Sequence, residues 1–360
     1  MRRAVPVRPE IRALRAYSFA TEAPVPVRAK LDFNESPYDV PDEIKQRVAS
    51  RLLARRWALY PEFGAGRLRR AIAASVGRHA EEIRVGNGSG EAILAALSVF
   101  AGGGGTILLT PPTFSLYPQL AAIAGARIAE VPLSGDDFVF DEDALLSAVR
   151  SNPGAVPLLC SPNNPTGGTV RPEFLRRLAR AAPVVLVDQA YVDFAPEDAS
   201  ALPLVSECEN VVVFRTLSKA FSAAGFRIGY AVAPPDLASE IGKAILPFNV
   251  DLASEELAVA LLEDPGPARA RVAEIVAERE RLAAALRALG AKVAPAAGNF
   301  VFVAPPRGGA GAVRQALLLR GVLVRDLGES APGRLRVTVG RREENDLFLA
   351  EFSRALKEAT

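Results

Sequence analysis

Apolar residues in this chain fall into short β-branched runs, and between the runs apolar positions recur at helical spacing. A run of four to six such residues predicts a buried strand, and helical spacing predicts a helix with one buried face. The strands expected in the first two thirds of the chain are 106–110, 126–131, 155–160, 184–187, 211–215 and 228–232. Helices are expected between most of them and also at 42–56, 67–76 and 92–100. This alternation favours an α/β fold with a mostly parallel sheet flanked by helices.

The pattern changes after Pro247. Helices expected at 254–262 and 268–289 are followed by short strands at 300–303, 322–324 and 335–339 and a last helix at 343–356. The first 35 residues are broken by prolines and keep no period. We therefore expect an N-terminal arm (1–35) that packs with the small domain or a partner subunit, a large domain (36–247) and a smaller α+β domain (248–360).

Composition narrows the classes of function. Hydrophobic residues make up 49% and charged residues 23% of the chain, as in ordinary globular proteins, and the net charge of +2 gives no reason to expect nucleic acid or a membrane as partner. No apolar run approaches the ~20 residues of a membrane-spanning helix. Two cysteines and one histidine make a disulfide framework, a zinc site and a Ser-His-Asp triad poor explanations. We expect a cytoplasmic protein without a metal.

Three predicted strands end in polar motifs. These are Ser161-Pro-Asn-Asn-Pro-Thr-Gly167, Asp188-Gln-Ala-Tyr191 and Thr216-Leu-Ser-Lys219. Ligands of open α/β sheets bind at the carboxyl ends of the strands. Asp188 follows four apolar residues, where a carboxylate is costly unless a cation faces it. Each motif alone is compatible with a turn, but together they predict a binding site.

Lys219 is the candidate nucleophile of this site. Lysine is scarce, with six among the 43 basic residues, and this one lies among hydroxyls with Arg227 eight positions later. Such a setting suits an amine that loses its proton and forms a Schiff base. A solvated lysine after a strand is the alternative.

A phosphate is a candidate ligand of the same site. Gly88, Ser89 and Gly90 open a predicted helix, whose first N–H groups favour an anion, and Ser218 and Arg227 supply further donors. Phe114 follows a strand, where its ring can stack on a planar ligand. An ordinary N-cap at Ser89 and core packing of Phe114 are the alternatives.

Taken together, these motifs resemble those of fold-type I pyridoxal-phosphate-dependent aminotransferases of the aspartate aminotransferase superfamily. The resemblance rests on Asn-Pro-Thr-Gly, Asp-x-Ala-Tyr and Ser-Lys-x-x-x-x-x-Gly-x-Arg, in this order, and extends from about Tyr17 to Arg342. Softer markers, including the turn at Asn34 and the segment Leu59-Tyr60-Pro61, are similar to those of the histidinol-phosphate aminotransferases.

The resemblance implies pyridoxal 5′-phosphate as cofactor and a role for each motif residue. Lys219 would be the Schiff-base lysine, Asp188 would pair with the pyridine nitrogen, and Asn164 and Tyr191 would bond the ring hydroxyl. Phe114 would stack on the ring, and the phosphate would be held by Gly88, Ser89, Gly90, Thr216, Ser218 and Arg227, with Tyr60 reaching it from the partner of a homodimer. The substrate would be bound by Tyr17, Asn34, Arg325 and Arg336.

The implied reaction moves an amino group between L-histidinol phosphate and 2-oxoglutarate or glutamate, in histidine biosynthesis. An aminotransferase for aromatic amino acids, a lyase similar to threonine-phosphate decarboxylase and a non-catalytic regulator are alternatives. Arg325 could also simply pair with a surface acid. Two positions depart from the usual pattern, because Gln189 and Gly90 stand where an acid is usual. Both departures bear on substrate preference more than on cofactor binding.

Overall fold

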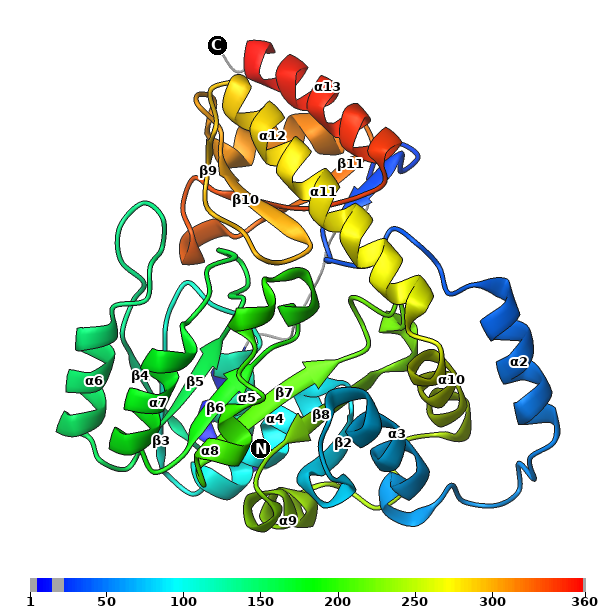
Figure 1. Cartoon of the computed structure of the whole chain (residues 1–360). Helices are drawn as coiled ribbons and strands as arrows, with labels where there is room; N and C mark the ends of the chain where they lie inside the picture. Colours follow the sequence, from blue (N-terminus) through cyan, green and yellow to red (C-terminus); the bar gives the residue numbers. More distant parts are fainter. Residues whose placement is uncertain (1–4, 15–22, 359–360) are drawn as a thin grey trace.

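The computed structural model describes residues 5–14 and 23–358 of the 360-residue chain. Two sheets organise these residues, a seven-stranded sheet in the lower part of Figure 1 and a five-stranded sheet at its top. The long helix α11 (Gly266–Ala288) runs from one part to the other.

The seven-stranded sheet has the order β2-β8-β7-β6-β5-β3-β4. Its strands are β2 (Ile83–Asn87), β3 (Thr106–Leu109), β4 (Arg127–Glu130), β5 (Ala155–Cys160), β6 (Val185–Asp188), β7 (Val211–Thr216) and β8 (Ile228–Val232). Within this sheet β8 runs antiparallel to both of its neighbours, and the other pairings are parallel. The predicted α/β fold is confirmed. The six strands expected from apolar runs are present, because central strands of such a sheet are buried on both faces.

Helices cover both faces of this sheet. Residues of α2 (Asp42–Leu53), α3 (Gly66–Val76), α6 (Glu142–Ser151), α7 (Pro172–Ala181), α8 (Leu204–Glu207) and α10 (Leu252–Glu263) belong to one hydrophobic core. Residues of α4 (Ser89–Phe100), α5 (Tyr117–Ala124) and α9 (Pro235–Ala244) belong to the core on the other face. Alternate strand residues serve the two cores: Val211 and Val213 face the first, and Val212 and Phe214 face the second.

The five-stranded sheet has the order β1-β11-β12-β10-β9 and packs with three helices. Its elements are β1 (Ala29–Leu31), β9 (Lys292–Val293), β10 (Phe300–Ala304), β11 (Val322–Asp326) and β12 (Leu335–Thr338), with α11, α12 (Gly309–Leu318) and α13 (Arg342–Glu358). A single turn of helix, α1 (Pro9–Arg12), contacts α5 of the larger sheet.

Two elements near the predicted domain limits, β1 and α10, pack with a part of the chain on the other side of the limit. β1, near the end of the predicted arm, pairs in parallel with β11 and so is a strand of the small sheet. Helix α10, which follows the predicted boundary at residue 247, packs on α2 and α3 through buried residues such as Leu257 and Leu261. The division of the chain into 1–35, 36–247 and 248–360 remains a prediction.

Candidate active site

A cavity of about 260 Å³ opens where β5, β6 and β7 end. Most residues singled out from the sequence line it: Ser89, Gly90, Phe114, Asn164, Asp188, Tyr191, Thr216, Ser218, Lys219, Arg227, Arg325 and Arg336. Residues not flagged in the sequence complete the wall, among them Phe33, Thr113, Ser115, Cys160, Leu327 and Ser330. The cavity therefore brings both sheets together around Lys219.

Asp188 is the buried acid of the cavity. Its carboxylate is 3% exposed and accepts two hydrogen bonds, from the Tyr117 hydroxyl to Oδ2 (2.7 Å) and from the Ala190 N–H to Oδ1 (3.0 Å). Burial raises the pKa of Asp188, and the two hydrogen bonds oppose that rise. A carboxylate held in this way is positioned to face a cationic ring nitrogen.

Lys219 follows β7 and is half-buried. Its Nζ donates a 3.1 Å hydrogen bond to the carbonyl of Phe33, in the turn after β1. Desolvation by burial, with the positive charge of Arg336 as the next cause, lowers the pKa of Lys219 to about 7. A large fraction of this amine is therefore unprotonated and nucleophilic near neutral pH.

Donors suited to a phosphate lie beside the start of α4. The Gly88 N–H donates to the carbonyl of Arg227 (2.7 Å), which places the arginine against the first turn of the helix. Gly88 has a φ of +80°, and a Cβ there would lie 2.4 Å from the Arg227 guanidinium. Thr216 donates to the Ile228 carbonyl (2.8 Å) and accepts from the Ser218 N–H (3.1 Å), which fixes this turn. Glycine at residue 88 is thus needed for the close approach of Arg227.

Tyr191 is held in a network of buried amides. Its hydroxyl accepts hydrogen bonds from Nδ2 of Asn34 (3.0 Å) and Nδ2 of Asn164 (3.4 Å). Oδ1 of Asn164 in turn accepts from Nη1 of Arg336 (2.7 Å), whose Nη2 donates to the Asp32 carbonyl. Burial raises the pKa of Tyr191 to about 12, so its hydroxyl stays protonated and can donate to a ligand.

Asn34 connects the segment after β1 to the small sheet. Its backbone N–H donates to Oγ1 of Thr338 (2.9 Å), and its carbonyl accepts from Nδ2 of Asn299 (3.0 Å). The residue adopts a φ of +54°, a region that asparagine tolerates better than most residues. Asn34 donates a hydrogen bond to the Tyr191 hydroxyl but is not among the residues that line the cavity.

Arg325 and Arg336 are direct neighbours on β11 and β12. Both line the cavity, and Arg336 is 8% exposed. Like charges opposite each other across an antiparallel pair repel, and a bound anion would relieve that repulsion. Guanidinium groups bind carboxylate and phosphate oxygens in a bidentate fork, so this wall is suited to an anionic substrate.

Tyr117 and Cys160 are buried residues beside Asp188 that the sequence did not flag. The ring of Tyr117 meets that of Phe114 edge-on, with the centroids 5.4 Å apart. Burial raises the pKa of the Cys160 thiol, so it stays neutral. The spacing of three between Phe114 and Tyr117 at a helix start was an available signal for this contact.

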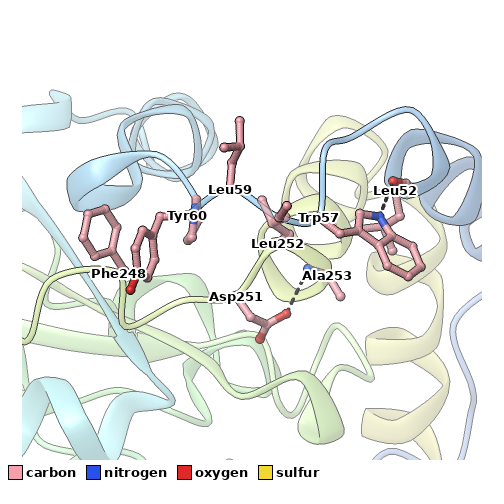
Figure 2. Close-up of a pocket in the computed structure, with 10 residues that line it drawn as sticks. Leu52, Trp57, Leu59, Tyr60, Phe248, Asp251, Leu252 and Ala253 are labelled. Carbon is pink, nitrogen blue, oxygen red and sulfur yellow. Dashed lines mark hydrogen bonds between the residues drawn. The ribbon is translucent and has the colours of Figure 1, made fainter.

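Tyr60 lies apart from the cavity in this chain. Its ring is 80% exposed and stacks on Phe248 at 4.7 Å, in a separate apolar pocket that Leu59 and Trp57 also line (Figure 2). Gly88 and Asn34 do not line the cavity either, and Tyr17 lies outside the described residues.

The two departures from the usual motifs have different surroundings. Gln189 is buried and bridges the following loop, donating to the Ala199 carbonyl (2.8 Å) and accepting from the Ala201 N–H (3.0 Å). It does not line the cavity. Gly90 does, and a Cβ there would meet Leu116 at an ordinary 3.6 Å. Gln189 therefore supports the loop, whereas Gly90 lies at the cavity wall, where a Cβ would fit against Leu116.

Within residues 5–14 and 23–358, no cluster of three or more potential metal ligands occurs. Within the same ranges no helix has both the length and the apolar composition needed to cross a bilayer.

Comparison with known proteins shows the family of this chain. The family model for aminotransferase class I and II matches residues 28–352, and the chain belongs to this family of pyridoxal-phosphate-dependent enzymes. Among its relatives are the histidinol-phosphate aminotransferases of Thermococcus kodakarensis and Gloeobacter violaceus. The first is 37% identical over 95% of this chain and 96% of its own length, and the second 39% over 96% of each.

A solved structure supports the fold. The histidinol-phosphate aminotransferase of Sinorhizobium meliloti in complex with pyridoxal-5′-phosphate superposes with a TM-score of 0.88 over 98% of each chain, at 23% identity. At this identity the likeness shows a shared fold. The predicted resemblance to fold-type I aminotransferases, and the cofactor it implies, are thereby confirmed.

Proposed function

We propose that this chain exchanges an amino group between L-histidinol phosphate and 2-oxoglutarate, with pyridoxal 5′-phosphate as cofactor, in histidine biosynthesis. The observation that carries the proposal is full-length similarity to relatives named for that activity. The presence of Arg325 and Arg336 in the same cavity as Lys219 supports it, because both substrates are anions.

The residues of the cavity fit the cofactor. Asp188 would face the ring nitrogen, Phe114 the ring face, and Asn164 and Tyr191 the ring hydroxyl. The phosphate would be held by Gly88, Ser89, Gly90, Thr216, Ser218 and Arg227. When bound, the cofactor supplies an electron sink for the bonding electrons released as a proton leaves the substrate carbon.

Lys219 would serve twice. Its unprotonated amine, favoured by a pKa of about 7, would hold the cofactor covalently through its aldehyde carbon, with the aldehyde oxygen leaving as water. The same nitrogen would also serve as the base that takes up and hands on the proton leaving the substrate carbon. The hydrogen bond from Nζ to Phe33 would restrain the amine at the cavity wall between these steps.

The arginines would serve both half-reactions. Histidinol phosphate has a phosphate and no α-carboxylate, whereas glutamate has two carboxylates. Arg336, held by Asn164 and Asp32, would present a fixed fork, and Arg325 would supply a second cation beside it. Asn34 would act on the substrate side through its contact with Tyr191.

The test is to mix the purified pyridoxal form with histidinol phosphate, histidinol, phenylalanine or threonine phosphate and follow its conversion to the pyridoxamine form. Histidinol phosphate should react fastest, and removal of its phosphate should lower the rate constant by about 30-fold or more, as for a lost buried charge contact. If phenylalanine reacts fastest, the enzyme is an aromatic aminotransferase. If threonine phosphate loses carbon dioxide while the cofactor stays in the pyridoxal form, it is a lyase. If none of the four compounds reacts, the result favours the alternative that the protein is a non-catalytic regulator.

We also propose a homodimer with shared sites. Large apolar side chains are exposed around Tyr60 and include Leu53, Trp57, Leu59 and Phe63. A second copy covering this surface (Figure 2) would remove it from water and bring Tyr60 to the partner's phosphate site.

Mixing two defective variants tests the shared site. Lys219→Ala and Tyr60→Phe subunits in equal amounts should form hybrids at half of the dimers, each with one intact site. About a quarter of the sites should then be intact if exchange is complete. The control mixes each variant with itself. A fully active species that sediments as a monomer would contradict the shared site.

We further infer that the protein works in the cytoplasm. Cys160 and Cys208 are both free thiols, which suits a reducing compartment.

Limited proteolysis would test the proposed division of the chain at residues 36 and 247, since cleavage should concentrate near limits that pack loosely.

A further inference from the structure

Tyr117 is buried completely at the start of α5, directly behind Asp188. Its hydroxyl donates to Oδ2 of the carboxylate at 2.7 Å, while the Ala190 N–H occupies Oδ1. The Phe114 ring, perpendicular to that of Tyr117, restrains it from the cavity side. The carboxylate is thus oriented by two fixed donors before any ligand binds.

The Tyr117 hydroxyl offsets part of the effect that burial has on the Asp188 carboxylate. Burial raises the pKa of Asp188, and the Tyr117 hydrogen bond is the leading cause that lowers it again. Burial also holds the pKa of Tyr117 well above its usual value, so the hydroxyl remains a donor. The Cys160 thiol and the Tyr191 hydroxyl also interact with Asp188. Both stay neutral because burial raises their pKa values.

We propose that Tyr117 is a positioning residue that fixes Asp188 and keeps the proton of the Asp188–pyridine pair on the ring nitrogen of the cofactor. The inference rests on the proposed cofactor site. A proton shared by two groups resides on the more basic one, and a hydrogen bond donated to the carboxylate makes it less basic. A protonated ring nitrogen is what allows the ring to accept electrons, so Tyr117 would act on the chemistry without touching the cofactor.

The experiment loads Tyr117→Phe and wild-type enzyme with cofactor labelled with ¹⁵N at the ring nitrogen. Nuclear magnetic resonance at one neutral pH then shows from the ¹⁵N chemical shift how far that nitrogen is protonated, and titration gives cofactor affinity. In the variant the ring nitrogen should be less protonated, because the proton moves towards the more basic carboxylate, and the cofactor should bind about tenfold more weakly, the scale of one hydrogen bond to a charged group.

Tyr230→Phe is the matched control. Tyr230 is a buried tyrosine on the opposite face of the same sheet, in a separate cavity with Arg215. Its loss removes a buried hydroxyl of the same kind and should leave the protonation of the ring nitrogen and the affinity unchanged.

A second variant guards against a folding defect. Replacement of Tyr117 by 3-fluorotyrosine keeps the shape of the side chain and makes its hydroxyl a stronger donor, so the ring nitrogen should be at least as protonated as in wild type. The inference is overturned if Tyr117→Phe and Tyr230→Phe behave alike, or if the fluorinated residue makes the ring nitrogen less protonated. Wild-type protein that binds no cofactor would instead overturn the proposed function.

Discussion

The seven-stranded and five-stranded sheets build two sides of one cavity by different means. The larger sheet brings Asp188, Thr216 and Lys219 to it from the ends of adjacent parallel strands or the turns that follow them. The smaller sheet contributes Arg325 and Arg336 from within antiparallel strands. The segment after β1 then joins the two, because the Asp32 carbonyl receives Arg336 and the Phe33 carbonyl receives Lys219.

This difference indicates a division of work. The cofactor residues proposed here sit largely on strand ends and helix starts of one buried sheet, where their positions are fixed relative to each other. The substrate arginines belong to the smaller sheet. Variants on the first side should therefore weaken cofactor binding or abolish its covalent link, whereas variants on the second should keep the cofactor and lose substrate.

The largest effect is expected for Lys219→Ala. Removal of the amine that binds the cofactor and carries the proton should lower turnover by about 10⁴-fold or more. Cofactor should still bind through its other contacts but should no longer be fixed to the protein by borohydride. Lys243→Ala, an exposed lysine paired with Glu240, is the control and should keep full activity. Cofactor that remains reducibly linked in Lys219→Ala would contradict the assignment.

A smaller loss is expected for Gly88→Ala on the same side. The added Cβ would lie 2.4 Å from the Arg227 guanidinium and displace it from the phosphate position. Cofactor affinity should fall about tenfold or more, as when a hydrogen bond to a charged group is lost. Gly103→Ala is matched, because its φ of +67° imposes similar strain in open space. Equal affinities in the two variants would argue against a phosphate at this helix start.

The pH dependence of cofactor capture gives a more graded effect. The rate at which apo-protein binds pyridoxal phosphate should rise about tenfold per pH unit below the Lys219 pKa of about 7 and level off above it. Pyridoxamine phosphate, which has no aldehyde, is the control and should not show this rise. A rate that keeps increasing towards the ordinary lysine value of 10.5 would show that the amine is not perturbed.

The same shift has a consequence for the stability of the apo-protein. Because the pKa is lower in the folded state, the unfolded chain binds more protons between about 7 and 10.5. Protonation of Lys219 is therefore unfavourable in the folded state, and the free energy of unfolding decreases as pH falls through this window.

The larger sheet was also the more predictable from sequence. Asp188 and Lys219 follow apolar runs that read directly as buried strands, and the ends of parallel strands meet by geometry. The sequence did not predict β2, because Gly86 and Asn87 are typical turn residues. In the structure Gly86 lies within the strand, and glycine is required there because a Cβ would lie 2.9 Å from the Ala92 nitrogen.

Contacts between distant segments were not predictable in the same way. The pairing of β1 with β11 and the hydrogen bond from Arg336 to Asp32 depend on register between parts of the chain separated by about 300 residues. Tyr117 was missed because an aromatic at helical spacing is ordinarily part of a core, and the partner of its hydroxyl, Asp188, lies 71 residues away on strand β6.

The division of work between the sheets is tested most directly by measuring cofactor affinity and half-saturating glutamate for Asp188→Asn and Arg336→Lys in parallel. Asp188→Asn should weaken cofactor binding by at least about 30-fold, the cost of removing one partner of a buried charge pair. Arg336→Lys should hold the cofactor as wild type does and need about 30-fold more glutamate, because lysine has no bidentate fork. Loss of cofactor from Arg336→Lys, with normal retention in Asp188→Asn, would contradict the account.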